Sequence, residues 1–180
     1  MKQVPLYQVD LIEMTVQYLG GKIEILAQAI DLAYQNGDND KAATLETEFE
    51  YLMRGADRLL CSHPTLRLEN WLGYARSWGS TPALKDYYEK NARRIVTIWG
   101  PPVDDYSARI WSGLIRDYYL PRWKHYFASK RDGKAFGLVE WERAWVEEKR
   151  GLSEVKPYED VLKACSDLMA RAKLIDHSLL

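Results

Sequence analysis

Two amphipathic aromatic side chains flank one short turn near the middle of the 180-residue sequence. Trp99 stands just before Gly100-Pro101-Pro102, and Tyr106 follows shortly after that turn. The whole composition favours such rings, with 7 Trp and 12 Tyr but only 3 Phe. Each ring combines an apolar face with a polar group, which suits the wall of a pocket for a sugar or another small polar molecule. Trp99 could equally plug the end of a helix, so the residues alone leave both roles open.

The acidic side chains are the second group that could do chemistry, and there are 26 of them. Hydrolysis of a glycosidic bond, for example, needs two carboxyl groups on either side of the scissile bond. Most acids here lie in helical segments and are expected to face solvent. Asp104-Asp105 is the one acidic pair beside the aromatic turn, where such residues usually cap a helix. We therefore predict no catalytic residue in this chain, and a hydrolase that uses Asp104 or Asp105 is the least favoured alternative.

The other motif searches give negative expectations. His63, His125 and His177 lack the spacing of metal ligands. The sequence also has no glycine-rich phosphate loop and no Gly-x-Ser-x-Gly nucleophile turn. We therefore expect no cofactor and no metal. Cys61 and Cys165 lie in apolar helical surroundings, which predicts two buried free thiols rather than a disulfide.

Charge and hydropathy argue against two classes of partner. The formal net charge is −1, so we expect no binding to nucleic acid. No stretch approaches the ~20 apolar residues that span a bilayer, so no membrane insertion is expected. The first five residues lack the apolar core of a signal peptide. Any export signal of the natural protein is therefore expected upstream of Met1.

Hydrophobic residues recur at helical spacing almost throughout the chain, and the alternation typical of strands is nearly absent. We predict helices over about 6–34 with a kink or break at Gly20-Gly21, then 41–60, 66–78, 81–99, 106–120 with a restart at Pro121, 138–149 and 157–175. Residues 36–40 should form a turn, and Thr81-Pro82 is typical of an N-cap followed by proline. The connections are short and no internal repeat is found. The prediction is one all-α domain over 1–180, a single bundle of about six to eight helices.

The segment 88–123 carries several motifs in a fixed order. They are Asn91-Ala92-Arg93, Thr97-Ile98-Trp99-Gly100-Pro101, Asp105-Tyr106-Ser107, Trp111-Ser112-Gly113-Leu114 and Tyr118-Tyr119-Leu120-Pro121-Arg122-Trp123. This series is similar to a pattern of the α-N-acetylglucosaminidases, glycoside hydrolase family 89, whose C-terminal helical domain typically reads N-A-R-x-x-x-T-L-W-G-P, D-Y-A-x-K-x-W-x-G-L and Y-Y-x-P-R-W. Two further stretches resemble family segments, namely 70–79 with its Asn-Trp-Leu and Ala-Arg-Ser-Trp-Gly, and 141–146 with Trp-Glu-Arg-Ala-Trp-Val. In coarse terms the whole chain resembles one family domain.

The resemblance implies roles for five residues of this chain. Trp99 and Tyr106 match positions that contact the sugar, and Val103 matches an aliphatic position that lines the same pocket. Arg93 and Arg122 match arginines that we expect to be structural, pairing with acids and supporting the aromatic turn. The turn that contains Val103 is shorter than is usual in the family.

The resemblance also implies an activity and a partner domain. Family members are retaining glycosidases that remove terminal α-linked N-acetylglucosamine, and their catalytic glutamates lie in an upstream barrel that this chain lacks. The chain should then form one wall of the active-site cleft and be inactive alone. The alternative is a non-enzymatic helical scaffold or protein-interaction module. An exposed apolar patch would favour the first hypothesis, and a fully polar surface would favour the second.

The family also implies a location, which is the lysosome in animals and the periplasm or exterior in bacteria. The natural glycan and the oligomeric state are not determined by the sequence. The sequence also does not say whether the chain is part of a longer protein.

Overall fold

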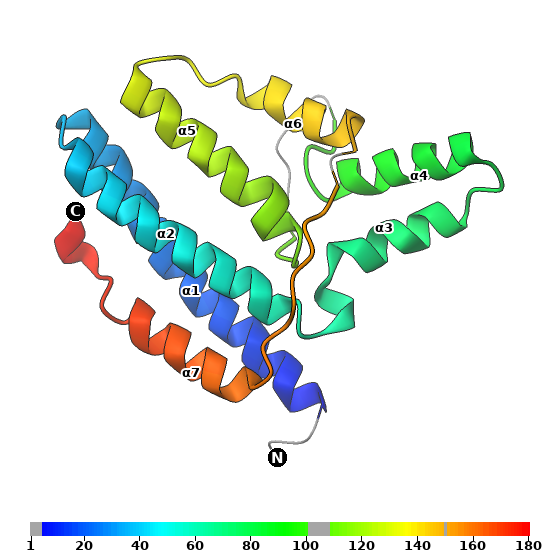
Figure 1. The fold of residues 1–180 in the computed structure, drawn as a ribbon, viewed down its shortest axis with the longest axis horizontal. Coiled ribbons are helices and arrows are strands. Elements are labelled where there is room, and N and C mark those ends of the chain that lie inside the picture. Colours follow the sequence, from blue (N-terminus) through cyan, green and yellow to red (C-terminus); the bar gives the residue numbers. More distant parts are fainter. Residues whose placement is uncertain (1–4, 101–108, 150) are drawn as a thin grey trace.

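The structure is a computed structural model that describes residues 5–100, 109–149 and 151–180. In these ranges the chain forms seven α-helices and no β-strand (Figure 1). They are α1 (Pro5–Gln35), α2 (Asn39–Leu60), α3 (Leu68–Ser77), α4 (Pro82–Ile95), α5 (Leu120–Asp132), α6 (Leu138–Glu147) and α7 (Val161–Ala172). Two 3₁₀ segments, η1 (Pro64–Leu66) and η3 (His177–Leu179), and one π segment, η2 (Ile115–Tyr119), accompany them. The predicted all-α fold class is confirmed. No helix of the described ranges has the length and apolar character to cross a membrane.

The helices pack around two hydrophobic cores. The larger core lies between α1, α2, α5 and α7, where Leu19, Leu52 and Leu168 are buried. The second core lies between α3, α4, α6 and η2, around Tyr118 and Trp145. Figure 1 shows that the α3–α4 hairpin projects away from the long α1–α2 pair. The chain therefore consists of a helical bundle and a projecting hairpin, and η2 contributes to the packing of both.

Side-chain caps set the starts of two helices, and the predicted cap at Thr81 is one of them. Asp38, in the predicted 36–40 turn, accepts a hydrogen bond from the Lys41 backbone N–H at 3.0 Å at the start of α2. The Thr81 hydroxyl accepts one from the Leu84 N–H at 3.3 Å at the start of α4. Gly79 makes the preceding turn possible, because a Cβ there would lie only 2.4 Å from the Lys85 backbone nitrogen. Cys61 and Cys165 are buried free thiols, as predicted.

The predicted break at Gly20-Gly21 is wrong, because α1 runs through both residues without interruption. Each glycine costs a helix about 1 kcal/mol relative to alanine. The buried face of α1 outweighs this cost, since residues such as Leu19, Leu26 and Ile30 pack in the larger core. Tertiary packing therefore overrides the local propensity here.

The predicted helices around the aromatic turn are also wrong in their limits. The first of them, α4, ends at Ile95 rather than near Trp99. Residues 109–113 are not helical, and the next helical residue is Leu114. The restart predicted at Pro121 is confirmed, because α5 begins at Leu120 directly after η2 and carries Pro121 in its first turn. Ile110 and Leu114 are four positions apart, and this apolar spacing predicted one helix face. In the structure Ile110 is half exposed whereas Leu114 is fully buried, so the two residues do not share a buried face.

The connection between α6 and α7 is longer than predicted. The last helix begins at Val161 rather than at 157, where the Asp160 carboxylate accepts a hydrogen bond from the Lys163 N–H at 2.9 Å. The extended connection crosses the bundle surface (Figure 1). Two arginines bind the backbone of this connection. Arg116 donates a hydrogen bond to the Ser153 carbonyl, and Arg58 donates one to the Lys156 carbonyl.

Candidate functional site

A cleft of about 650 Å³ lies where α3, the end of α4 and residues 109–111 meet. Four aromatic rings line it, namely Trp71, Tyr74, Trp99 and Trp111. The polar lining includes Thr65, Asn70, Arg67 and Arg109. None of the described lining residues is a carboxylate. This combination of rings, a few polar groups and positive charge suits the binding of a polar ligand, but the described walls contain no acid for catalysis.

The backbone directly after α4 directs Trp99 into this cleft. Trp99 has a φ of 55°, in the left-handed region where a bulky side chain is an outlier. Its backbone N–H donates to the Arg94 carbonyl at 2.8 Å, which ends the helix there. The side chain is 53% exposed and lines the cleft. Trp99 therefore does not plug the end of α4, and backbone strain of this kind is characteristic of functional sites.

Two further tryptophans, Trp71 and Trp111, line the cleft. The rings of Trp71 and Trp111 lie 5.9 Å apart between centroids. The Trp71 indole donates to the Ala92 carbonyl at 3.0 Å, which ties α3 to α4. The Arg109 guanidinium lies over the Trp111 ring at 5.6 Å. These contacts hold both rings in place from two different segments.

Residues 109–113 are positioned by a short backbone bridge to the start of α3. The Ser112 N–H donates to the Leu66 carbonyl at 2.8 Å, and the Leu68 N–H donates to the Ser112 carbonyl at 2.9 Å. Gly113 follows with a φ of 93°, and a Cβ there would lie 3.2 Å from the Leu68 Cβ. A side chain at this position would therefore be strained and would press on α3.

A buried carboxylate on α2, that of Asp57, binds residues 112–116. Asp57 accepts hydrogen bonds from the Gly113 N–H at 2.7 Å, the Arg116 N–H at 3.2 Å and the Ser112 hydroxyl at 3.3 Å. It also forms an ion pair with the Arg116 guanidinium at 2.6 Å. Burial raises the pKa of Asp57, and the charge of Arg116 opposes that rise. Sequence reasoning missed Asp57, although an acid between the buried Met53 and Leu60 on an apolar helix face was the available signal.

The two arginines with expected structural roles lie inside the second core rather than in the cleft. Arg93 is buried and pairs with Glu89 at 2.9 Å, while its guanidinium lies 4.7 Å from the centre of the Trp145 ring. Arg122 donates to the Glu142 carboxylate at 2.6 Å. Arg93 stands in the last turn of α4, just before the aromatic turn.

The other predicted site residues, Val103 and Tyr106, lie outside the described residues, as do Asp104 and Asp105. In the described ranges no three His, Cys, Asp or Glu side chains come together as a metal site would require. Sequence reasoning did not assign Trp71 and Trp111 to the site. Half-buried tryptophans in helical motifs resemble core residues, so no local signal distinguished them.

The fold and the cleft define the class of the molecule as an all-helical domain with a cleft lined by aromatic and cationic side chains. Residues 1–171 match the family described as the Alpha-N-acetylglucosaminidase (NAGLU) C-terminal domain. The chain therefore belongs to this family, as its motifs predicted.

Individual relatives agree with this assignment. Human alpha-N-acetylglucosaminidase is 28% identical over 137 residues, which are 74% of this chain and 18% of the human protein. A family 89 glycoside hydrolase from Clostridium perfringens in complex with PUGNAc has a TM-score of 0.86 and 25% identity over 98% of this chain. A Clostridium perfringens structure in complex with its substrate GlcNAc-α-1,4-galactose has a TM-score of 0.79 and 27% identity over 91% of this chain. The chain spans only about a fifth of the length of these relatives.

Proposed function

We propose that this helical domain forms one wall of the active-site cleft of an α-N-acetylglucosaminidase and binds terminal α-linked N-acetylglucosamine. Trp99 would stack on the sugar ring, and Tyr106 and Val103 would contact the same sugar from the turn that follows. The observation that carries the proposal is the half-exposed Trp99, held in a strained conformation in an aromatic cleft. Ring stacking combined with nearby amide and hydroxyl groups, here Asn70 and Thr65, is the chemistry that sugars require.

The proposal assigns the bond cleavage to another part of the protein. Glycoside hydrolysis needs two carboxyl groups beside the scissile bond. The charged residues of the described cleft lining are Arg67 and Arg109, both cationic. The relatives are more than about four times as long as this chain. The resemblance supplies a catalytic barrel upstream, so the chain alone is expected to bind but not to cleave. The reaction needs no cofactor.

The structural arginines support the cleft indirectly in this proposal. Arg93 and its partner Glu89 fix the last turns of α4, which end at the strained Trp99. Arg122 and Glu142 join α5 to α6 within the second core. Loss of either ion pair should therefore act on the position of Trp99 or on stability rather than on contact with the sugar.

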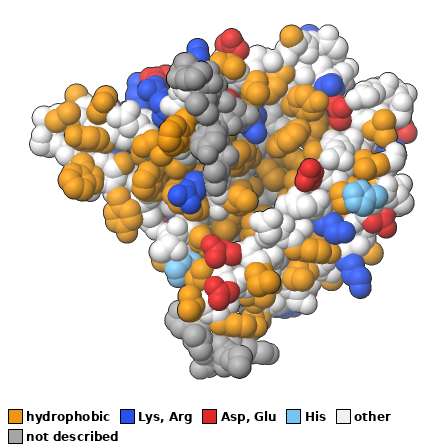
Figure 2. Space-filling view, turned by 180° about the vertical axis from the view of Figure 1, so that it is seen from behind, with side chains coloured by type: hydrophobic (Ala, Val, Ile, Leu, Met, Phe, Trp, Pro, Cys, Tyr) orange, Lys and Arg blue, Asp and Glu red, His pale blue; other side chains and the backbone are white. Residues whose placement is uncertain are grey.

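The surface of the hairpin favours this proposal over an isolated scaffold. Eight of the fifteen exposed large hydrophobic side chains in the described ranges lie on the α3–α4 hairpin and the segments that flank it, and they are Tyr74, Trp78, Leu84, Tyr87, Tyr88, Ile95, Trp99 and Ile110. Figure 2 shows hydrophobic side chains gathered on the hairpin side of the rear face. Such a patch is typical of a surface that contacts a ligand or another domain.

The test is a titration of the 180-residue chain with methyl α-N-acetylglucosaminide, followed through the tryptophan indole N–H signals by NMR. We expect weak, saturable shifts of the Trp99 signal as the sugar is added. In Trp99→Ala, the signals of the other cleft tryptophans should no longer shift. The chain alone should not hydrolyse an aryl α-N-acetylglucosaminide. Hydrolysis by the chain would show that its own carboxylates catalyse the reaction. A Trp99 signal that does not respond up to the solubility limit of the sugar would refute the cleft role.

A further inference from the structure

A row of aromatic side chains extends from the cleft along α3. Trp71, Tyr74 and Trp78 follow the spacing i, i+3, i+7, which places them on one face of the helix. Trp71 and Tyr74 line the cleft itself. Tyr74 is 70% and Trp78 is 80% exposed, and these are the two most exposed aromatic rings in the described ranges. We call these three residues the aromatic track.

We infer that the aromatic track binds the sugar units of the glycan that follow its terminal residue. The inference rests on the proposed function, because the cleft beside Trp99 must hold the terminal sugar. A helix rises 1.5 Å per residue, so the track from Trp71 to Trp78 covers about 10 Å. This is the length of a disaccharide. The chain would therefore recognise an oligosaccharide rather than a single sugar.

The hairpin holds the track in a fixed position. Arg76 lies between Tyr74 and Trp78 in sequence, and its guanidinium reaches across to α4. It pairs with Asp86 at 3.1 Å and with Glu89 at 2.6 Å. A binding surface that is already ordered loses little conformational freedom when a ligand binds. The helix that carries the track is thus held in place, while its two outer rings are open to solvent.

The position of this face, which continues from the cleft, favours a sugar chain over a protein partner. The residues exposed on the track are Tyr74 and Trp78, both amphipathic and neither aliphatic. Asn70, one residue before the track, adds an amide group to the adjoining cleft. Sugars present apolar ring faces edged by hydroxyl groups, so separated rings with polar neighbours match them.

The experiment compares glycans of increasing length on the intact 180-residue chain. The ligands are oligosaccharides of one to four sugars that all end in α-linked N-acetylglucosamine, and binding is followed by the indole N–H signals. We expect affinity to rise with length up to three sugars. In Trp78→Ala the longer glycans should bind about five- to tenfold more weakly, the factor that corresponds to about 1–1.4 kcal/mol at 25 °C. Monosaccharide binding should be unchanged in this variant.

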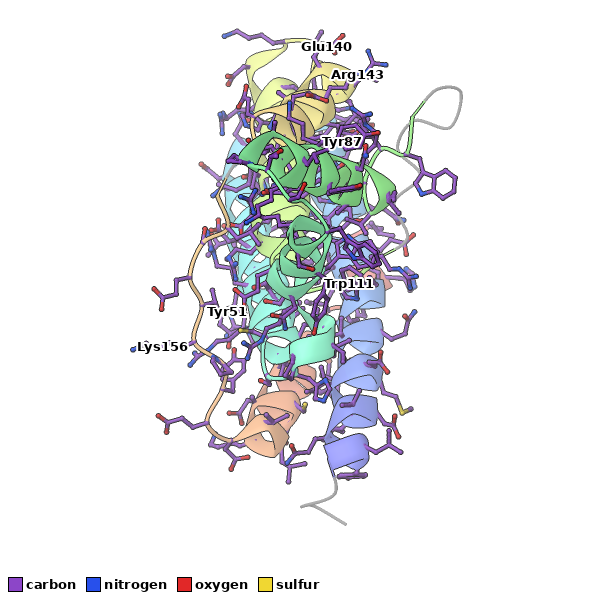
Figure 3. The ribbon with its side chains drawn as sticks, turned by 90° about the vertical axis from the view of Figure 1, so that its right-hand side faces the viewer. Tyr51, Tyr87, Trp111, Glu140, Arg143 and Lys156 are labelled. Carbon is purple, nitrogen blue, oxygen red and sulfur yellow. The ribbon has the colours of Figure 1, made fainter. Side chains whose placement is uncertain are left out.

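Two further variants separate the track from the proposed function. Trp99→Ala should weaken binding of every glycan, whatever its length. Tyr87→Ala is the matched control, because Tyr87 is 59% exposed on α4 but does not line the cleft, and Figure 3 shows it away from Trp111. It should leave all affinities unchanged. Far-UV circular dichroism confirms that each variant is folded.

Three outcomes would overturn the inference. If affinity did not depend on glycan length but Trp99→Ala still weakened binding, the role of the track would be refuted and the proposed function would stand. If Trp78→Ala weakened monosaccharide binding as much as tetrasaccharide binding, Trp78 would belong to the terminal-sugar site instead. A wild-type dimer that becomes monomeric in Trp78→Ala, without a change in length dependence, would identify the face as a protein contact.

Discussion

Removal of the Asp57 carboxylate should destabilise the fold at the base of the cleft. Asp57 is buried and binds the side chain of Arg116 and the backbone N–H groups of Gly113 and Arg116. In Asp57→Ala these donors lose their buried acceptor. Loss of one partner from a buried ion pair costs about 3–5 kcal/mol. The Arg116 guanidinium keeps Asp117 at 2.9 Å, so we expect about 3 kcal/mol, at the lower end of this range.

The assay is equilibrium unfolding in urea at pH 7, followed by tryptophan fluorescence and circular dichroism. Asp57→Asn should lie between wild type and Asp57→Ala, because the amide keeps an acceptor for Gly113 but loses the charge that pairs with Arg116. Asp167→Ala is the matched control. It removes an exposed ion pair with Lys163 on α7, which should contribute less than about 1 kcal/mol.

The cleft provides a second readout of the same substitution. Asp57 fixes the segment that begins with Trp111, so the Trp111 indole signal should broaden or move in Asp57→Asn. A loss of less than about 1 kcal/mol in Asp57→Ala, equal to that of Asp167→Ala, would refute the anchoring role.

Three other predictions concern the helices and the buried thiol. Gly21→Ala should stabilise the chain by about 0.5–1 kcal/mol, because α1 is continuous there and a new Cβ meets no atom within 4 Å. Gly79→Ala should destabilise the chain by about 1–3 kcal/mol or more, because the new Cβ would overlap backbone atoms. Urea midpoints in the reverse order would contradict both expectations. A hydrogen bond from Lys90 lowers the pKa of Glu147 below its usual 4.5. The stability advantage of wild type over Glu147→Gln should therefore be present above pH 4.5 and disappear as the pH falls through the folded-state pKa. An equal difference in stability at pH 7 and at pH 3 would contradict this pH dependence. Burial raises the pKa of the Cys165 thiol, so it should react with Ellman's reagent far more slowly in the native chain than in urea, and equal rates would contradict its burial.

Sequence patterns predicted the features that depend on contiguous residues. The predicted cap at Thr81 was correct because an N-cap side chain binds a backbone N–H only three residues away. The helical periodicity of 41–60 was correct because its apolar stripe faces one core along its whole length. The motifs around Trp99 identified the family because they preserve residue types in order along the chain.

Only the tertiary structure decided how the cleft is assembled. The helical spacing of Ile110 and Leu114 predicted a helix, yet residues before Leu114 pair with the start of α3 across more than 40 positions of sequence. Asp57 binds the same segment from 55 residues away in sequence, at Ser112. No local pattern encodes such contacts, because each depends on where other helices lie. The sequence by itself therefore determined the helices and the family, whereas the packing of α2 and α3 against residues 109–116 determined the shape of the site.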